Sequence, residues 1–145
     1  MRLIGFIALF SALLASCDQA PPPPGPGGNG NANTTTWPST QTTDGGAFSV
    51  TMAPIQGTIL RNEHFSLDLL VEPQQADPGP LQVKVDADMP AHRHGMHTQT
   101  EVTSYGKNKY RVDGMLFHMS GDWVITVEVT GGDGTEQATV PVSIK

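Results

Sequence analysis

Residues 47–145 repeatedly alternate apolar and polar side chains with a period of two, and this pattern constrains the fold more than any other feature. The clearest runs lie at residues 65–71, 81–87 and 123–129. Such alternation is typical of strands that bury one face and expose the other. Gly, Pro, Asn and Asp separate the runs at intervals typical of an antiparallel sandwich. The pattern therefore predicts an all-β, immunoglobulin-like antiparallel β-sandwich.

The sandwich is expected to hold seven or eight strands, with a closed barrel as the alternative. The 16 glycines and 12 prolines among 145 residues argue against long helices. Pro141 lies in the last run, and because proline cannot donate a ladder hydrogen bond, this strand is expected at a sheet edge. The expected strands span residues 48–52, 58–60, 64–71, 81–87, 98–104, 110–118, 123–130 and 135–144.

Residues 1–17 have the composition of a bacterial secretory signal. Arg2 precedes an apolar run over residues 3–15, which is shorter than the roughly 20 residues that a membrane-spanning helix needs. The run ends in the letters LASC at residues 14–17, which resemble the lipobox of bacterial lipoproteins. That resemblance implies cleavage before Cys17 and lipidation of its thiol, and more than one acyl chain makes a stable anchor. A cleaved signal followed by an unmodified cysteine is the alternative.

Residues 18–46 are predicted to form a disordered tether. The stretch holds consecutive prolines at positions 21–24, then Gly, Asn, Ser and Thr, and Trp37 is its only large apolar residue. A segment of this composition buries too little apolar surface to fold, but it can hold a domain away from a surface. We therefore expect a lipid-anchored protein of the bacterial cell envelope, on the extracytoplasmic side of the inner or outer membrane.

Charge and motif content exclude several classes of function. Only 8 Lys and Arg stand against 14 Asp and Glu, so the basic face that nucleic acids require is not expected. The single cysteine excludes an internal disulfide and a Cys-rich zinc site. No nucleophile elbow or zinc-protease motif occurs, and so small a sandwich leaves little room for a substrate pocket. We expect a binding protein rather than an enzyme.

Histidine and methionine gather in two short stretches, residues 89–97 and 115–119, which hold four of the five histidines and four of the six methionines. Side chains two residues apart share a face of an extended strand, so alternate residues of the first stretch can present donors together. Imidazole suits copper and zinc, and thioether sulfur selects Cu(I). If the two stretches meet at one rim of the sandwich, they form a site for Cu(I) or Cu(II). The predicted ligands are His92, His94, Met96 and His118.

Other residues of these stretches have structural explanations as well. Met89, His97 and Met119 are expected either to ligate the metal or to lie behind the ligands, and Met119 also fits a buried apolar face. His118 is as consistent with packing at the core margin as with ligation. The isolated His64 is expected to be a solvated surface residue.

Two segments resemble a known family. They are the pattern MPxHxHGM at residues 89–96 and the pattern YxVxGMxFxMxGxWxI at residues 110–125. Both are similar to the YtkA-like and FixH-like domains, small exported immunoglobulin-like sandwiches of bacteria, often found as lipoproteins or beside copper and cytochrome-oxidase assembly genes. The resemblance covers residues 47–145 and implies a non-enzymatic, metal-associated accessory role.

These observations lead to one expected function and two alternatives. We expect a membrane-anchored copper-binding accessory protein that captures copper or delivers it to, or receives it from, another envelope protein. The first alternative is a structural or assembly module that binds an envelope protein without metal. The second is zinc binding at His92, His94 and His118.

Overall fold

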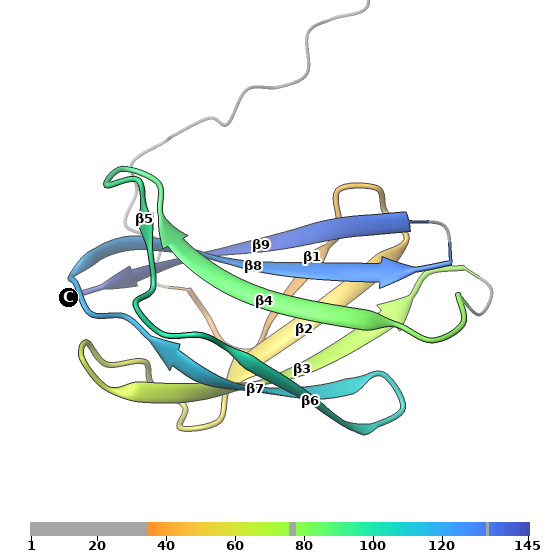
Figure 1. Cartoon of the computed structure of the whole chain (residues 1–145), viewed down its shortest axis with the longest axis horizontal. Helices are drawn as coiled ribbons and strands as arrows, with labels where there is room; N and C mark the ends of the chain where they lie inside the picture. The colour runs from red at the N-terminus through yellow and green to blue at the C-terminus, as the bar shows by residue number, and fades with distance from the viewer. Residues whose placement is uncertain (1–34, 76–77, 133) are drawn as a thin grey trace, which may run out of the picture. The chain divides into compact units, whose positions relative to one another are not determined.

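The structure is a computed structural model that describes residues 35–75, 78–132 and 134–145. The predicted signal peptide, the lipidation site Cys17 and the tether up to residue 34 lie outside these residues. Within them the chain forms nine strands (Figure 1). None of these residues belongs to a helix long and apolar enough to cross a membrane.

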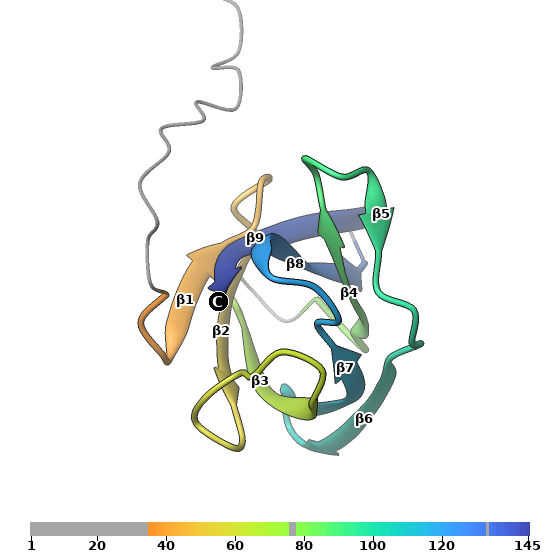
Figure 2. The same ribbon diagram turned by 90° about the vertical axis from the view of Figure 1, so that its left-hand side faces the viewer.

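The strands form two antiparallel sheets that pack face to face. One sheet has the strand order β1-β2-β3-β7-β6 and the other β5-β4-β8-β9, and Figure 2 shows both sheets from one end. The strands are β1 (Ser39–Thr42), β2 (Phe48–Pro54), β3 (His64–Pro73), β4 (Gln82–Met89), β5 (His94–Gly95), β6 (Glu101–Gly106), β7 (Lys109–Leu116), β8 (Gly121–Gly131) and β9 (Gly134–Ile144). The sheets do not close into a barrel, so the predicted all-β sandwich is confirmed. Pro141 lies on the edge strand β9, as expected.

A cluster of aromatic side chains fills the core at one end of the sandwich. Trp123 and Phe117 are fully buried, and their rings stack with centroids 4.7 Å apart. Phe65 meets Phe117 edge-on at 5.0 Å. The indole Nε1 of Trp123 donates a hydrogen bond of 3.0 Å to the carbonyl oxygen of Met119, which satisfies its only polar atom. The cluster therefore fixes the loop that leads from β7 to β8.

β1 extends the sandwich on the N-terminal side of residue 47. It pairs antiparallel with β2, with Ser39 opposite Met52, and Trp37 packs against the core. The expectation that residues 35–46 continue a disordered tether is therefore wrong. This short polar strand is stable because it gains ladder hydrogen bonds from β2 and apolar contact through the tryptophan.

The strand expected at residues 58–60 is instead part of the loop between β2 and β3. Gly57 has a φ of 80°, which interrupts extended structure. The amide nitrogen of Asn62 donates a hydrogen bond of 2.9 Å to the carbonyl oxygen of Phe117. The loop is therefore held against the end of β7. β6 also starts later than expected, at Glu101.

Gly114 interrupts the regular pairing of β7. The register between β3 and β7 shifts between Phe65 and Leu67, and Gly114 opposite this irregularity has a φ of 85°. A Cβ atom at this position would lie 2.4 Å from the carbonyl oxygen of Gln99. Only glycine combines the positive φ with so close a backbone approach. It thereby lets the segment before β6 pass directly over β7.

We predict that Gly114→Ala lowers the free energy of unfolding by about 2–4 kcal/mol, because a strained φ is combined with a backbone clash. Gly46→Ala is the matched control, since Gly46 has a φ of 80° and open space around it, so its loss should be only about 1 kcal/mol. Denaturant titration measures both. Equal losses in the two variants would show that the close approach at Gly114 is not restrictive.

Candidate functional site

The first histidine stretch forms a tight turn at the end of β4. The amide nitrogens of His92 and Arg93 each donate a hydrogen bond of 2.9 Å to the carbonyl oxygen of Met89, and Arg93 has a φ of 56°. β5 then returns alongside β4, with His94 opposite Met89 (Figure 1). The prediction that this stretch is one extended strand is therefore wrong. The turn places His92 at an exposed tip, and His94 is the only histidine of the stretch that lies on a strand.

The second stretch places His118 in the loop between β7 and β8, above the buried indole of Trp123. The two rings lie 5.4 Å apart between centroids and are nearly perpendicular, at 75°. His94 approaches the same indole at 6.3 Å and 69°. One buried tryptophan therefore supports an imidazole from each stretch.

The two stretches meet at one end of the sandwich, where four histidines form a row. The ring centroids lie 5.8 Å apart for His92 and His94, 5.5 Å for His94 and His118, and 3.9 Å for His118 and His97. The last two rings are stacked, with 23° between their planes. We call these four residues the histidine row. His97, predicted either to ligate the metal or to lie behind the ligands, stacks on His118.

Neighbouring members of the histidine row differ in whether they can share a metal ion. Nitrogen–metal bonds of about 2 Å place the ring centroids of two ligands roughly 4.5 to 6.5 Å apart. The His92–His94 and His94–His118 pairs fall in this range, but the stacked pair at 3.9 Å does not. In the described part of the chain, no three His, Cys, Asp or Glu side chains are grouped so as to hold a metal ion. The structure therefore does not group His92, His94 and His118 around one point, which the prediction of a shared site requires.

His94 and His118 each carry a buried ring nitrogen without a hydrogen-bond partner. The Nδ1 atoms of both are shielded from solvent and have no partner in the described residues. An unpaired buried polar atom costs on the order of 1–3 kcal/mol, and native proteins contain few of them. Burial, and then the neighbouring His97 and His94, lower the pKa of His118. The lowered pKa favours the neutral ring, which is the form that binds metals.

The methionines near the row occupy different environments. The Sδ atom of the half-buried Met96 accepts a hydrogen bond of 3.4 Å from the amide nitrogen of Leu116, so its thioether lies beside the strand that leads to His118. Met89 is buried in the core, with its Cε against Gly121, which makes it a packing residue. Met119 is 37% exposed, so the prediction that it fits a buried face is wrong. Its backbone carbonyl accepts the hydrogen bond from the indole of Trp123.

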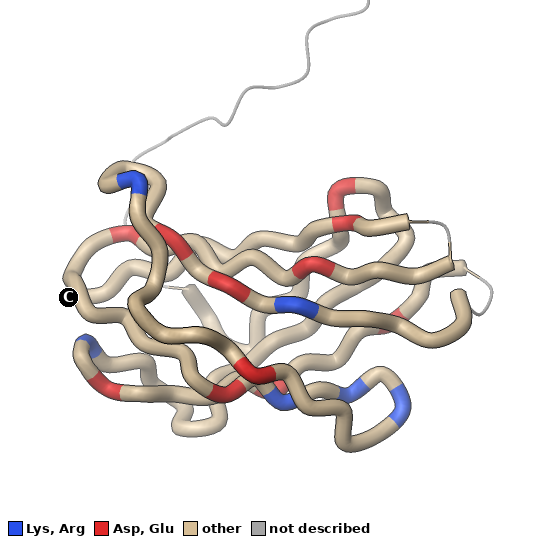
Figure 3. Tube along the Cα trace, viewed as in Figure 1, with Lys and Arg blue, Asp and Glu red and all other residues tan. Residues whose placement is uncertain are grey.

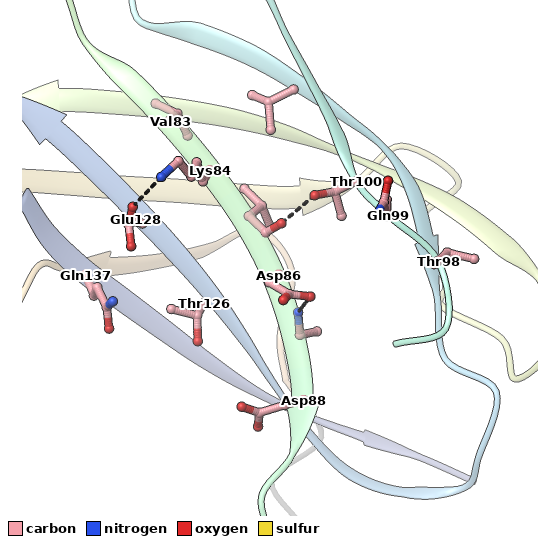
Figure 4. A pocket seen from close by; sticks show the side chains of 13 residues that line it. Val83, Lys84, Asp86, Asp88, Thr98, Gln99, Thr100, Thr126, Glu128 and Gln137 are labelled. Atoms are coloured by element: carbon pink, nitrogen blue, oxygen red, sulfur yellow. Dashed lines mark hydrogen bonds and ion pairs between the residues drawn. The ribbon is translucent and has the colours of Figure 1, made fainter. Parts of the chain in front are cut away.

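A second concave region lies along β4 and β8 and is also lined by Thr98, Gln99 and Thr100 (Figure 4). This open groove has a volume of about 790 Å³. Lys84 and Glu128 form an ion pair of 3.2 Å across it, and the hydroxyl of Thr100 donates a hydrogen bond of 2.5 Å to the carbonyl oxygen of Val85. No histidine or methionine lines it.

Figure 3 shows acidic and basic residues distributed along both sheets.

A family model of YtkA-like proteins matches residues 62–128. The chain carries a YtkA-like domain. The matched span runs from the start of β3 into β8 and includes the whole histidine row. No curated protein and no solved structure matches the chain. The strands β1, β2 and β9 lie outside the matched span, and they complete the two sheets of the sandwich.

The lowered pKa of His118 predicts a stability that falls in mild acid. The unfolded chain binds this proton with a pKa of about 6.5, and the folded YtkA-like domain binds it less readily. The contribution of the neutral ring is therefore complete above about pH 6.5 and is lost as the pH falls through the lower folded-state pKa. His94 and His97 are the titratable neighbours, and neither forms an ion pair with an acid in the described residues.

We predict that thermal unfolding of the metal-free protein shifts to lower temperature between about pH 7.5 and pH 5, and that His118→Gln reduces this shift. His64→Gln is the control, because His64 is exposed and lies outside the row. A His118→Gln variant that loses as much stability in acid as the parent protein would contradict the assignment.

Proposed function

We propose that this protein binds copper outside the cytoplasm and captures it or delivers it to another envelope protein. One observation supports the proposal most. The ring centroids of His94 and His118 lie 5.5 Å apart, and each ring has a buried Nδ1 atom without a hydrogen-bond partner. A metal ion held by these two rings would accept the lone pairs of these nitrogens, for which the described residues provide no hydrogen-bond donor. The same arrangement has no evident use in a purely structural sandwich, where apolar residues would pack without an unpaired nitrogen.

The types of donor favour copper over other ions. Imidazole binds copper and zinc, whereas calcium and magnesium take oxygen ligands. Met96, two residues after His94, adds a thioether, and sulfur of this kind favours Cu(I). Zinc usually takes four ligands in a tetrahedron. In the histidine row, only pairs of neighbouring imidazoles have a spacing that suits one ion. A Cu(I) ion accepts so few ligands more readily, so zinc is the weaker proposal.

The position of the row suits exchange of the ion. His92 and His97 are exposed at one end of the sandwich, where the ligands of a second protein can approach. A site built from neutral imidazoles and a thioether, without thiolate, holds copper less firmly than a cysteine site. The partner is accordingly a copper-receiving or copper-exporting protein of the envelope.

The N-terminal sequence supports a membrane anchor. The LASC letters at residues 14–17 have the form of a lipobox, and Cys17 is the only cysteine. Acyl chains at this residue would hold the protein on the inner or outer membrane, on the extracytoplasmic side. The segment between Cys17 and β1 then keeps the histidine row near membrane partners, which raises their effective concentration.

We predict that the detergent-purified protein binds Cu(I) saturably in competition with a chromophoric chelator, and that His94→Ala and His118→Ala each weaken binding by about tenfold or more. Each substitution removes one ring of the pair with buried Nδ1 atoms. His64→Ala serves as the control, since this histidine lies on the exposed side of β3. Absence of saturable binding, or binding that both variants leave unchanged, would favour the metal-free assembly module instead.

We predict that Cys17→Ala abolishes incorporation of a labelled fatty acid and moves the protein from the membrane fraction to the soluble fraction, because no thiol remains for acylation. Ser16→Ala, which keeps a small residue before the cysteine, should leave both properties unchanged. Retention of the label in the Cys17→Ala protein would exclude this residue as the anchor.

A further inference from the structure

The two metal-compatible pairs of the histidine row have one member in common. His94 lies 5.8 Å from His92 on one side and 5.5 Å from His118 on the other, measured between ring centroids. Both spacings are compatible with two imidazoles on one ion. The three rings are not grouped around a single point. Two alternative positions for an ion therefore exist, and both use His94.

The two positions differ in exposure. His92 lies at the exposed tip of the turn after β4, whereas His94 and His118 are half-buried. Among the described residues that are not exposed, His94 and His118 each have a buried Nδ1 atom without a hydrogen-bond partner. The outer position, between His92 and His94, is therefore open to ligands from solution. The inner position, between His94 and His118, is sheltered by the protein.

The two positions also differ in the ring contacts that hold their ligands. His118 is stacked on His97 at 3.9 Å and meets the buried Trp123 at 5.4 Å, nearly perpendicular. These contacts fix the plane of its ring. The ring contacts recorded for His92, by contrast, are limited to His94 in the described residues, and the neighbouring Arg93 adopts a positive φ in the turn. The outer ligand His92 is therefore held by fewer ring contacts than the inner ligand His118.

We infer that the histidine row passes one copper ion between an outer position, formed by His92 and His94, and an inner position, formed by His94 and His118. This inference rests on the proposed function. Cu(I) binds first at the outer position, and the nitrogen of His92 then leaves as the nitrogen of His118 binds. His94 stays bound throughout. The ion keeps its oxidation state, so the step is a ligand exchange without electron transfer, and release to a partner follows the reverse order.

The test measures both the affinity and the exchange rate of Cu(I) in the full-length protein, with bicinchoninate as the competing chelator in stopped-flow and equilibrium titrations. His92→Ala removes only the outer position, so we expect an affinity within about threefold of the parent and exchange slowed by about tenfold. His118→Phe removes the inner nitrogen but keeps a ring that can stack on His97, and we expect an affinity lowered by about tenfold with exchange at least as fast. His64→Ala is the control for both measurements.

Each outcome separates this inference from the proposed function. If the parent protein binds no Cu(I), the proposed function fails. If the protein binds copper but His92→Ala weakens the affinity as much as His118→Phe does, one ion is held by all three rings and the two-position inference fails. An unchanged exchange rate in His92→Ala excludes the outer position. Two copper ions per chain at saturation also overturn the inference, because a shared His94 allows one ion at a time.

Discussion

The packing of Trp123 is the interaction on which the rest of the site depends. Its indole stacks on Phe117 and donates a hydrogen bond to the carbonyl of Met119. The same indole contacts the rings of His94 and His118 at steep angles. These contacts fix both ends of the short loop between β7 and β8. Without a buried side chain of this size, the loop would lack its main apolar support. The position of the histidine row is thus set by the hydrophobic core rather than by polar contacts.

The row also lies where the two sheets are joined. β7 belongs to one sheet and β8 to the other, so the loop that carries His118 crosses between them, while His94 lies on the edge strand β5. The hydrogen bond from Leu116 to the sulfur of Met96 links the same two sheets. An ion bound between His94 and His118 would therefore connect the sheets at this end. Binding at such a point stabilises the folded state by mass action, since the unfolded chain does not hold these rings together.

The sequence predicts the fold better than it predicts the site, and the reasons are physical. Long strands alternate with a period of two because each has one buried face, so β3, β4, β8 and β9 are readily expected. β1 escapes this reasoning because its residues STQT are polar and its stability comes from pairing with β2. The meeting of the two histidine stretches follows from strand ends sharing a rim. The lack of a common point for His92, His94 and His118 could not be predicted, because the positive φ of Arg93 ends the extended geometry that the alternation implies.

The unpaired nitrogens of His94 and His118 lower the stability of the folded protein. A leucine at either position would fill similar volume without leaving a buried polar atom, and each unpaired nitrogen costs on the order of 1–3 kcal/mol in a protein whose total stability is about 5–15 kcal/mol. The stacked His97 and the surrounding core hold His118 in this unfavourable state instead of relieving it. Groups kept in such environments are typical of functional sites, where a ligand offsets the cost. The cost of these unpaired nitrogens therefore supports the proposal that the histidine row binds a ligand.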